Sequence, residues 1–208
     1  MLWSPDVYIP LFEQNGFITD LDYNIYEKAF RWLQESAAQL PAQFRLSLNV
    51  SPLHFEQPQI FIEKIRDLID LYHINPARLT FEITESTYVN NPDAVNQVIH
   101  SLQSQNIQIS MDDFGSGYSS LNTLKDLLFD EVKIDRMFLG NSLTANGKIV
   151  LQEVFHMLKR MGKSIVCEGV ETKEMADFLL NEGCNEIQGF LYYRPMCQTD
   201  FEKSALLF

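Results

Sequence analysis

From residue 46 onward, short apolar runs alternate along the chain with longer stretches that have helical periodicity. The apolar runs have the length and composition of buried β-strands, and they cover residues 46–50, 79–84, 107–112, 131–135, 164–169 and 185–189. Between them, apolar residues recur at spacings of three and four, as in residues 60–69 and 150–161. Strands that alternate with helices through short connections pair in parallel, so the pattern predicts an α/β fold, either an open doubly wound sheet or a barrel.

The N-terminal part of the chain lacks this alternation. Ser4 and Pro5 favour the start of a helix, and residues 20–40 have the apolar stripe of a second helix. Two helices followed by six strand–helix units predict an eight-unit barrel entered partway round its cycle. We find no linker and no low-complexity segment, so we expect a single domain over residues 1–208, with no second domain.

The composition limits the kind of partner. Hydrophobic residues make up 46% of the 208 residues, enough for a large core. The 16 Lys and Arg against 28 Asp and Glu give a formal net charge of −12, which argues against binding to polymeric nucleic acid or to an anionic membrane. A phosphate-bearing ligand would therefore need a cation as an intermediary.

The number of cysteines and the lengths of the apolar runs indicate the cellular compartment of the protein. Cys167, Cys184 and Cys197 are an odd number without a metal-type spacing, so we expect reduced thiols inside the core. No apolar run approaches the roughly 18 residues of a membrane span, and the N-terminus lacks a secretion signal. These features predict a cytoplasmic protein without direct membrane insertion.

Polar residues gather where the predicted strands end: Asn49, Glu82, Asp112, Asp113, Lys133, Asp135, Glu168 and Gln188. In parallel barrels the C-terminal ends of the strands carry the functional site. Adjacent carboxylates repel each other, so Asp112 and Asp113 favour a nearby cation. Carboxylate and amide oxygens are ligands for Mg²⁺, Mn²⁺ or Ca²⁺, and we therefore expect a divalent-cation site at this rim.

Each residue also has a purely structural interpretation. A lone acidic residue at a strand end is commonly a helix cap or a solvated loop residue, as Asp113 or Glu171 would be. Lys133 and Asp135 would then form a structural ion pair. The occurrence of polar residues at the ends of all six predicted strands favours a functional site over these separate structural roles. Gly115 and Gly117 indicate a shaped loop over residues 114–120 that closes over the rim, and we assign the four histidines no catalytic role.

Several segments together resemble the EAL-type cyclic-di-GMP phosphodiesterases. They are YIPLFEQNGFI, LNVSP, FEITES, MDDFGSGYSSL, DEVKIDRMFL, VCEGVET and GCNEIQGFLYYRP. The resemblance covers nearly the whole chain. It implies a TIM-like (β/α) barrel, two divalent cations, Mg²⁺ or Mn²⁺, at the rim, and hydrolysis of cyclic di-GMP to the linear dinucleotide in bacterial second-messenger signalling.

The resemblance also assigns roles. The expected cation ligands are Asn49, Glu82, Asp112, Asp113 and Glu168, with Asp112 bridging the two cations. Lys133 would contact the attacking water or phosphate, Glu168 would assist proton removal, and Glu85 would steady the glycine loop. The nucleotide pocket would be formed by Asp135, Glu171, Gln188 and Pro195.

One departure from the family is large. The sequence contains no Glu-Ala-Leu tripeptide, so one cation ligand and two N-terminal strands are expected to be missing from an incomplete barrel. The chain is then a fragment or a short member of the family, with impaired hydrolysis, and its open sheet edges predict a homodimer, a rearranged N-terminus or low stability. The alternative is an inactive module that binds cyclic di-GMP or a protein partner. An unrelated barrel enzyme, such as one with an enolase-like site, is a third interpretation.

Overall fold

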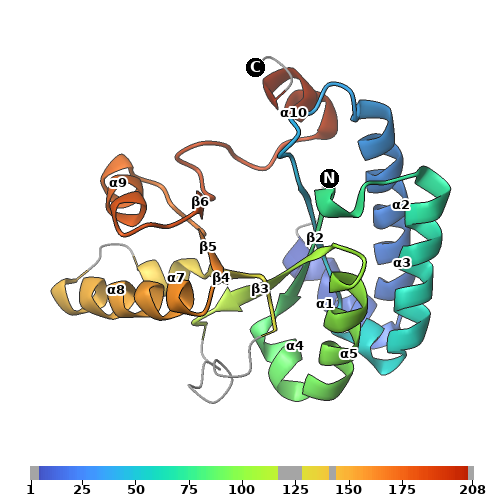
Figure 1. Ribbon diagram of the computed structural model, residues 1–208, viewed down its shortest axis with the longest axis horizontal. Coiled ribbons are helices and arrows are strands. Elements are labelled where there is room, and N and C mark those ends of the chain that lie inside the picture. Colours follow the sequence, from blue (N-terminus) through green and yellow to red (C-terminus); the bar gives the residue numbers. More distant parts are fainter. Residues whose placement is uncertain (1–4, 117–127, 141–143, 206–208) are drawn as a thin grey trace. The chain divides into compact units, whose positions relative to one another are not determined.

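The computed structural model of the chain describes residues 5–116, 128–140 and 144–205. It divides into two compact units, Met1–Ile109 and Ser110–Phe208, which are named unit 1 and unit 2 below. Each unit is an α/β arrangement in which the strands are parallel and helices follow them in the sequence. Figure 1 labels these elements along the chain.

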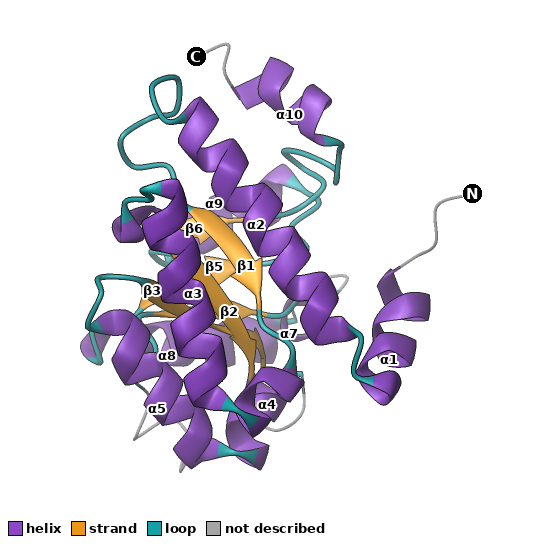
Figure 2. Ribbon diagram, turned by 90° about the vertical axis from the view of Figure 1, so that its right-hand side faces the viewer, coloured by secondary structure: helices purple, strands orange, loops and turns teal. Residues whose placement is uncertain are grey.

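Unit 1 begins with two helices before its first strand, as the sequence predicts. Its elements are α1 (Pro5–Asn15), α2 (Ile18–Ser36), β1 (Leu46–Asn49), α3 (Pro58–Tyr72), β2 (Leu79–Thr84), α4 (Glu85–Asn90) and α5 (Pro92–Gln103), with short 3-10 helices η1 (Pro52–Glu56) and η2 (Pro76–Arg78). In Figure 2, α2 and α3 lie side by side over β1 and β2. The apolar stripe of α3 is buried, with Phe61 and Ile65 at 1% and 0% exposure.

Unit 2 begins at Ser110, which lies within β3 (Gln108–Phe114). Its other elements are β4 (Glu131–Ile134), α7 (Arg136–Leu139), α8 (Ala145–Arg160), β5 (Ser164–Cys167), α9 (Lys173–Asn181), β6 (Glu186–Ile187) and α10 (Gln198–Ala205). The strands β3 to β6 pair in parallel in sequence order. Leu151, Phe155 and Leu158 of α8 are fully buried, and this helix packs on β5.

Each predicted apolar run contains an observed strand, but several boundaries move. The run at 131–135 ends at Ile134, because Asp135 is the N-cap of α7, where its Oδ1 accepts a hydrogen bond from the Met137 N–H at 2.6 Å. The run at 185–189 narrows to Glu186–Ile187, and the predicted helix at 20–40 occupies Ile18–Ser36. Strand identity therefore follows from apolar runs, whereas the ends depend on caps and turns.

Candidate functional site

In unit 1, the ends of β1 and β2 bring Asn49 and Glu82 next to each other. The two residues are Cα partners in the parallel register. The Val50 N–H donates a hydrogen bond to the Glu82 carbonyl oxygen at 3.0 Å, which extends the pairing by one residue. Register partners of parallel strands present their side chains on the same face of the sheet. Asn49 is exposed and Glu82 is 8% exposed, so one amide and one carboxylate lie side by side there.

Glu85 occupies the first position of α4, directly after β2. It is 1% exposed, and Thr84 caps the helix by accepting a hydrogen bond from the Thr87 N–H at 3.4 Å. The N-terminal end of a helix favours a carboxylate electrostatically. The loop that Glu85 is expected to steady continues through residues 117–120, which lie outside the described residues. The role of Glu85 therefore stays a prediction.

In unit 2, one lysine joins two of the candidate carboxylates. The Lys133 Nζ atom lies 3.0 Å from the Asp112 Oδ1 atom and 2.7 Å from the Glu168 Oε1 atom. Lys133 is 5% exposed, and the two carboxylate side chains are 14% and 19% exposed. Charges held this far from water interact strongly, and each depends on its partners for solvation. The sequence predicted a positive group beside the adjacent carboxylates Asp112 and Asp113. Among the described contacts of Asp112, that positive group is the Lys133 ammonium.

The pair Asp112 and Asp113 lies at an irregularity in β3 rather than in a regular strand. The register with β4 shifts between Met111 and Phe114, and Asp113 has a φ of 57°, in the left-handed region. The Asp113 N–H donates to the Asp112 Oδ1 atom at 3.0 Å. Because the strand bulges, the simple alternation of side chains to opposite faces does not hold here. The left-handed backbone conformation costs a non-glycine residue about 1–2 kcal/mol. Residues held in such conformations cluster at functional sites.

A cavity of about 420 Å³ lies within unit 2. Five of the residues that line it were expected to bind cation or nucleotide: Asp135, Glu168, Glu171, Gln188 and Pro195. They come from the ends of β4 and β5 and from the segment after β6. The structure thus brings these side chains around one cavity, while their roles stay a prediction. Glu171 itself precedes the N-cap of α9, which is Thr172.

Gly189 shapes one wall of this cavity through a close approach of two main-chain segments. The Val170 N–H donates to the Gln188 carbonyl oxygen, and the Leu191 N–H donates to the Val170 carbonyl oxygen, both at 3.1 Å. A Cβ atom on Gly189 would overlap the nitrogen and the carbonyl oxygen of Val170. Only glycine fits there, so the motif residue has a steric explanation.

Sequence reasoning did not find all of the cavity lining. Arg136, Phe190, Tyr193 and Arg194 also line it, and the Arg194 guanidinium carbon lies 4.4 Å from the centre of the Phe190 ring. That distance is within the range of a cation–π contact. The cluster of aromatic and basic residues just after a glycine in GFLYYRP could have indicated Phe190, Tyr193 and Arg194, whereas Arg136 has no such signal.

The cysteine prediction is wrong for one residue. Cys167 and Cys184 are buried, but Cys197 is exposed because it lies in the polar segment at the start of α10. A hydrogen bond between the two buried thiols raises the pKa of Cys167 and lowers the pKa of Cys184. Burial alone would raise both, so the contact between the sulfurs decides the direction for Cys184.

The donor chemistry fits a hard divalent cation. Asp112 and Glu168 share the Lys133 ammonium in unit 2, and Asn49 and Glu82 place an amide beside a carboxylate in unit 1. Within residues 5–116, 128–140 and 144–205, no three or more His, Cys, Asp or Glu side chains are gathered as a metal site would require. Lys133 binds the two carboxylates of unit 2 instead.

Comparisons with known proteins agree on one family. A model described as "EAL domain" matches residues 1–195. The probable cyclic di-GMP phosphodiesterase PdeG of Escherichia coli is 32% identical over 204 residues, which are 98% of this chain and 40% of PdeG. The bifunctional diguanylate cyclase/cyclic di-GMP phosphodiesterase MucR of Pseudomonas aeruginosa is 34% identical over 196 residues, 94% of this chain and 28% of MucR. The chain thus spans less than half the length of these relatives.

Solved structures give the same result for the fold. The PaMucR phosphodiesterase in complex with c-di-GMP has a TM-score of 0.87 at 32% identity, and the match covers 95% of this chain and 80% of that one. The EAL enzyme Bd1971, bound to cAMP and cyclic di-GMP, has a TM-score of 0.90 at 26% identity, covering 98% and 56%. Among the helices of the described ranges, none has both the length and the apolar composition to cross a bilayer. The predicted fold class, a TIM-like barrel of the EAL type with six parallel strands in the described residues, is confirmed, and the chain belongs to the EAL domain family.

Proposed function

We propose that this chain carries the site of a cyclic-di-GMP phosphodiesterase, which hydrolyses one phosphodiester bond and releases the linear dinucleotide. The observation that carries the proposal is the cavity of unit 2, around which Asp135, Glu168, Glu171, Gln188 and Pro195 meet. The substrate class is supported by PdeG and MucR, which are named for cyclic di-GMP, and by the c-di-GMP complex of PaMucR.

The oxygen donors proposed for divalent cations, Mg²⁺ or Mn²⁺, are Asn49 and Glu82 in unit 1 and Asp112, Asp113 and Glu168 in unit 2. Bound there, such cations lower the pKa of a coordinated water and offset the negative charge of the phosphate. The formal net charge of −12 supports this need, because an acidic chain otherwise repels a phosphodiester.

Lys133 and Glu168 have the position for proton and phosphate chemistry. The Lys133 ammonium is buried and is held by the Asp112 and Glu168 carboxylates. It would donate a hydrogen bond to the attacking water or to a phosphate oxygen. Glu168 lines the cavity and is partly exposed, so its carboxylate is available to accept the proton of the water.

The lining of the cavity also has groups that match a guanine base. The Glu171 carboxylate is able to accept two hydrogen bonds from the donor edge of guanine, and the Gln188 amide offers both a donor and an acceptor. Phe190 and Tyr193 provide aromatic faces for stacking. Arg194 supplies a positive charge beside Phe190. These contacts would orient the base and leave the phosphate near Lys133.

Turnover is expected to be slow. The Glu-Ala-Leu tripeptide, which supplies one cation ligand in the family, does not occur in this sequence. Loss of a direct carboxylate ligand weakens a metal site by more than the roughly 10- to 100-fold that follows loss of an outer residue. We also propose a homodimer, because the open sheet edges expected of an incomplete barrel favour pairing with a second copy, and a cytoplasmic location, which the free cysteines favour.

A second function has one observation in its favour. The Lys133 ammonium binds Asp112 and Glu168 together, and both of these carboxylates are needed for the cations. A chain in which Lys133 keeps both carboxylates would bind cyclic di-GMP in the cavity without hydrolysing it.

One assay separates the two functions. The chain is incubated with cyclic di-GMP and Mn²⁺ or Mg²⁺, and the linear dinucleotide is quantified by chromatography. We expect product with either cation, no product with a chelator, and a rate at least about 100-fold lower in Asp113→Asn. The matched control is Asp177→Asn on α9, an exposed partner of Lys173 at 3.0 Å, which should leave the rate unchanged.

The outcomes are distinct. Binding of cyclic di-GMP by calorimetry without product from the wild-type chain would establish the binding function instead. A chain that neither binds nor hydrolyses cyclic di-GMP would contradict both.

A further inference from the structure

The peptide group between Asn49 and Val50 is held from both sides. Its N–H, which belongs to Val50, donates to the Glu82 carbonyl oxygen of β2 at 3.0 Å. Its carbonyl oxygen, which belongs to Asn49, accepts a hydrogen bond from the Tyr26 hydroxyl of α2 at 2.6 Å. A peptide plane fixed at both ends cannot rotate without breaking one of the two bonds. The backbone direction at Asn49 is therefore set jointly by β2 and by α2.

Tyr26 is itself held rigidly. It is 1% exposed, and its ring packs edge-on against Phe81 of β2 at a centroid distance of 5.6 Å. A phenol hydroxyl buried this deeply needs a partner, and the Asn49 carbonyl oxygen provides it. β1 pairs with β2 through one of its edges, and the Tyr26 hydroxyl meets the carbonyl that points away from that edge.

A second contact from the same helix fixes the residues just after Asn49. The Asp22 Oδ2 atom accepts a hydrogen bond from the Ser51 N–H at 3.3 Å and lies 2.9 Å from the His54 Nε2 atom. Ser51 in turn caps η1, because its Oγ atom accepts from the Leu53 N–H at 3.4 Å. Asp22 and Tyr26 are four residues apart on α2, so they lie on one face of that helix.

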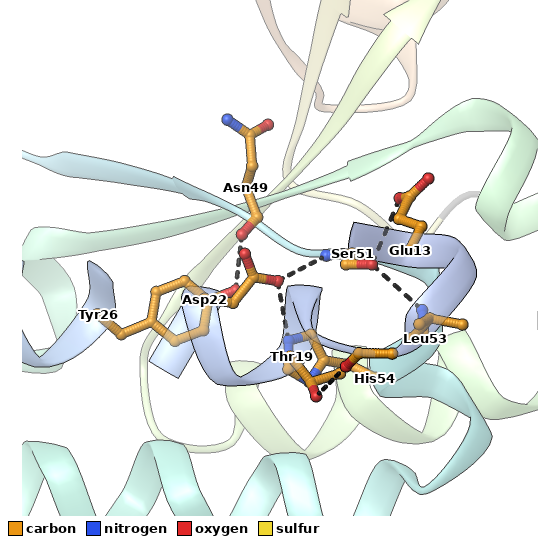
Figure 3. Close-up of polar contacts among 9 residues, drawn as sticks. Glu13, Thr19, Asp22, Tyr26, Asn49, Ser51, Leu53 and His54 are labelled. Atoms are coloured by element: carbon orange, nitrogen blue, oxygen red, sulfur yellow. Dashed lines mark hydrogen bonds and ion pairs between the residues drawn. The ribbon is translucent and has the colours of Figure 1, made fainter. Parts of the chain in front are cut away.

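Figure 3 shows the result of these contacts. The carbonyl oxygen of Asn49 points toward Tyr26, while its side-chain amide points away from the network. Asp22 lies between Ser51 and His54. The network therefore grips the main chain of Asn49 and leaves its amide available to a ligand.

We propose that Tyr26 and Asp22 are positioning residues, which orient the Asn49 side chain for the divalent cation through the main chain on either side of it. The inference rests on the proposed function, because it takes Asn49 as a cation ligand. Tyr26 and Asp22 act from the second helix of the chain and have no direct contact with the cation. This role differs from simple stabilisation, since it predicts an effect on cation affinity beyond any effect on folding.

Manganese binding tests the proposal. Mn²⁺ affinity is measured by electron paramagnetic resonance of the free ion, in the wild-type chain and in Tyr26→Phe, Tyr23→Phe, Asp22→Asn and Asn49→Ala. Tyr26→Phe removes only the hydroxyl and should weaken Mn²⁺ binding about 10-fold, as outer residues of metal sites do. Tyr23→Phe removes a hydroxyl one turn earlier on α2, for which the described residues provide no hydrogen-bond partner, and should leave the affinity unchanged.

A second measurement, made without metal, tests the orientation of the Asn49 segment. The NMR signals of the Asn49 side-chain amide, and the hydrogen exchange of the Val50 and Ser51 amides, report the orientation of this segment directly. We expect Tyr26→Phe to shift the Asn49 signals and to speed exchange at Val50. Asp22→Asn, which keeps one oxygen acceptor, should speed exchange mainly at Ser51.

The positioning role and the proposed function have different contradicting outcomes. Weaker binding in Asn49→Ala together with wild-type affinity in Tyr26→Phe would overturn the positioning role and leave the proposed function intact. Unchanged binding in Asn49→Ala would remove Asn49 from the cation site, and with it this inference about the cation. Unchanged NMR signals in Tyr26→Phe would overturn the orienting contact itself.

Discussion

The two units hold their candidate ligands by different means. In unit 1, Asn49 and Glu82 are register partners, and the peptide group after Asn49 is bonded on both sides, so the main chain fixes them. In unit 2, Asp112 and Glu168 meet through their shared ion pairs with Lys133. Main-chain hydrogen bonds do not respond to the charge of a ligand, whereas carboxylates paired to an ammonium rearrange when another cation arrives. Unit 1 therefore offers preformed donors and unit 2 offers adjustable ones.

The surroundings of the polar groups reinforce this contrast. His54 in unit 1 is 3% exposed and lies among aromatic rings, with Phe61 at 4.7 Å and Tyr23 at 5.0 Å between centroids. The cavity of unit 2 has acidic and basic residues in its lining, such as Glu171 and Arg194. Changes in unit 1 should act through packing and hydrogen bonds, and changes in unit 2 should act chiefly through charge.

The largest effect should come from Lys133→Met. This change leaves Asp112 and Glu168 without their shared ammonium, and removing one partner of a buried ion pair lowers the free energy of unfolding by about 3 kcal/mol. Urea denaturation measures this loss. Mn²⁺ should restore more stability to the variant than it adds to the wild-type chain, because a cation then replaces the ammonium.

The control is Lys173→Met, since Lys173 forms an exposed ion pair with Asp177 on α9. Exposed pairs contribute at most about 1 kcal/mol, so its stability should stay close to that of the wild type. Equal losses in the two lysine variants would show that charge does not hold the carboxylates of unit 2 in place.

A smaller effect is expected from Gly189→Ala, which tests whether backbone packing also matters in unit 2. The added Cβ overlaps the main chain of Val170, and overpacking of this kind lowers the free energy of unfolding by about 1–3 kcal/mol. The midpoint temperature of thermal unfolding should fall, and the affinity for cyclic di-GMP should decrease.

For comparison, Gly147→Ala in the first turn of α8 meets only the Thr144 Oγ1 atom at 3.1 Å and gains helix propensity. Its stability should change by less than about 1 kcal/mol. A Gly189→Ala chain as stable as Gly147→Ala would mean that the close approach to Val170 is not required.

The smallest effect concerns alkaline pH in unit 1. Burial, aided by the Asp22 carboxylate, raises the pKa of Tyr23 to about 12 and raises the pKa of Tyr26 well above its ordinary value of 10. Between pH 10 and about 12 the unfolded chain loses phenol protons that the folded chain retains, so the free energy of unfolding falls as the pH rises.

Urea denaturation at pH 9 and pH 11 measures this slope. Tyr23→Phe should reduce the loss by about 1 kcal/mol, less than a full two-unit shift would give because Tyr23 is only half-buried. An identical slope in wild type and Tyr23→Phe would contradict the raised pKa.

Much of the fold could be predicted from local patterns, while its details could not. Parallel strands and crossover helices follow from apolar runs and helical stripes, and those patterns depend only on neighbouring residues. The bulge at Asp113 and the cap at Asp135 depend on hydrogen bonds, and the sequence pattern does not distinguish them from regular strand positions. For that reason the apolar run at 131–135 extends one residue beyond β4.

The candidate site shows the same limit. Its acidic residues stand out because they end apolar strands, so Glu168 and Asp112 could be found from spacing. Tyr26 and Asp22 could not, since their importance comes from contacts between α2 and the end of β1, which are separated by more than twenty residues. Long-range contacts of that kind leave no periodic pattern in a single sequence.

Crystals of the chain soaked in Mn²⁺ provide the most direct test of the central claim, that acidic and amide groups at the strand ends bind divalent cations. Anomalous diffraction should show a manganese peak beside Asp112, with the Lys133 ammonium displaced from at least one of its two carboxylates. A map without any peak near Asp112, in which Lys133 still binds both Asp112 and Glu168, would contradict the account.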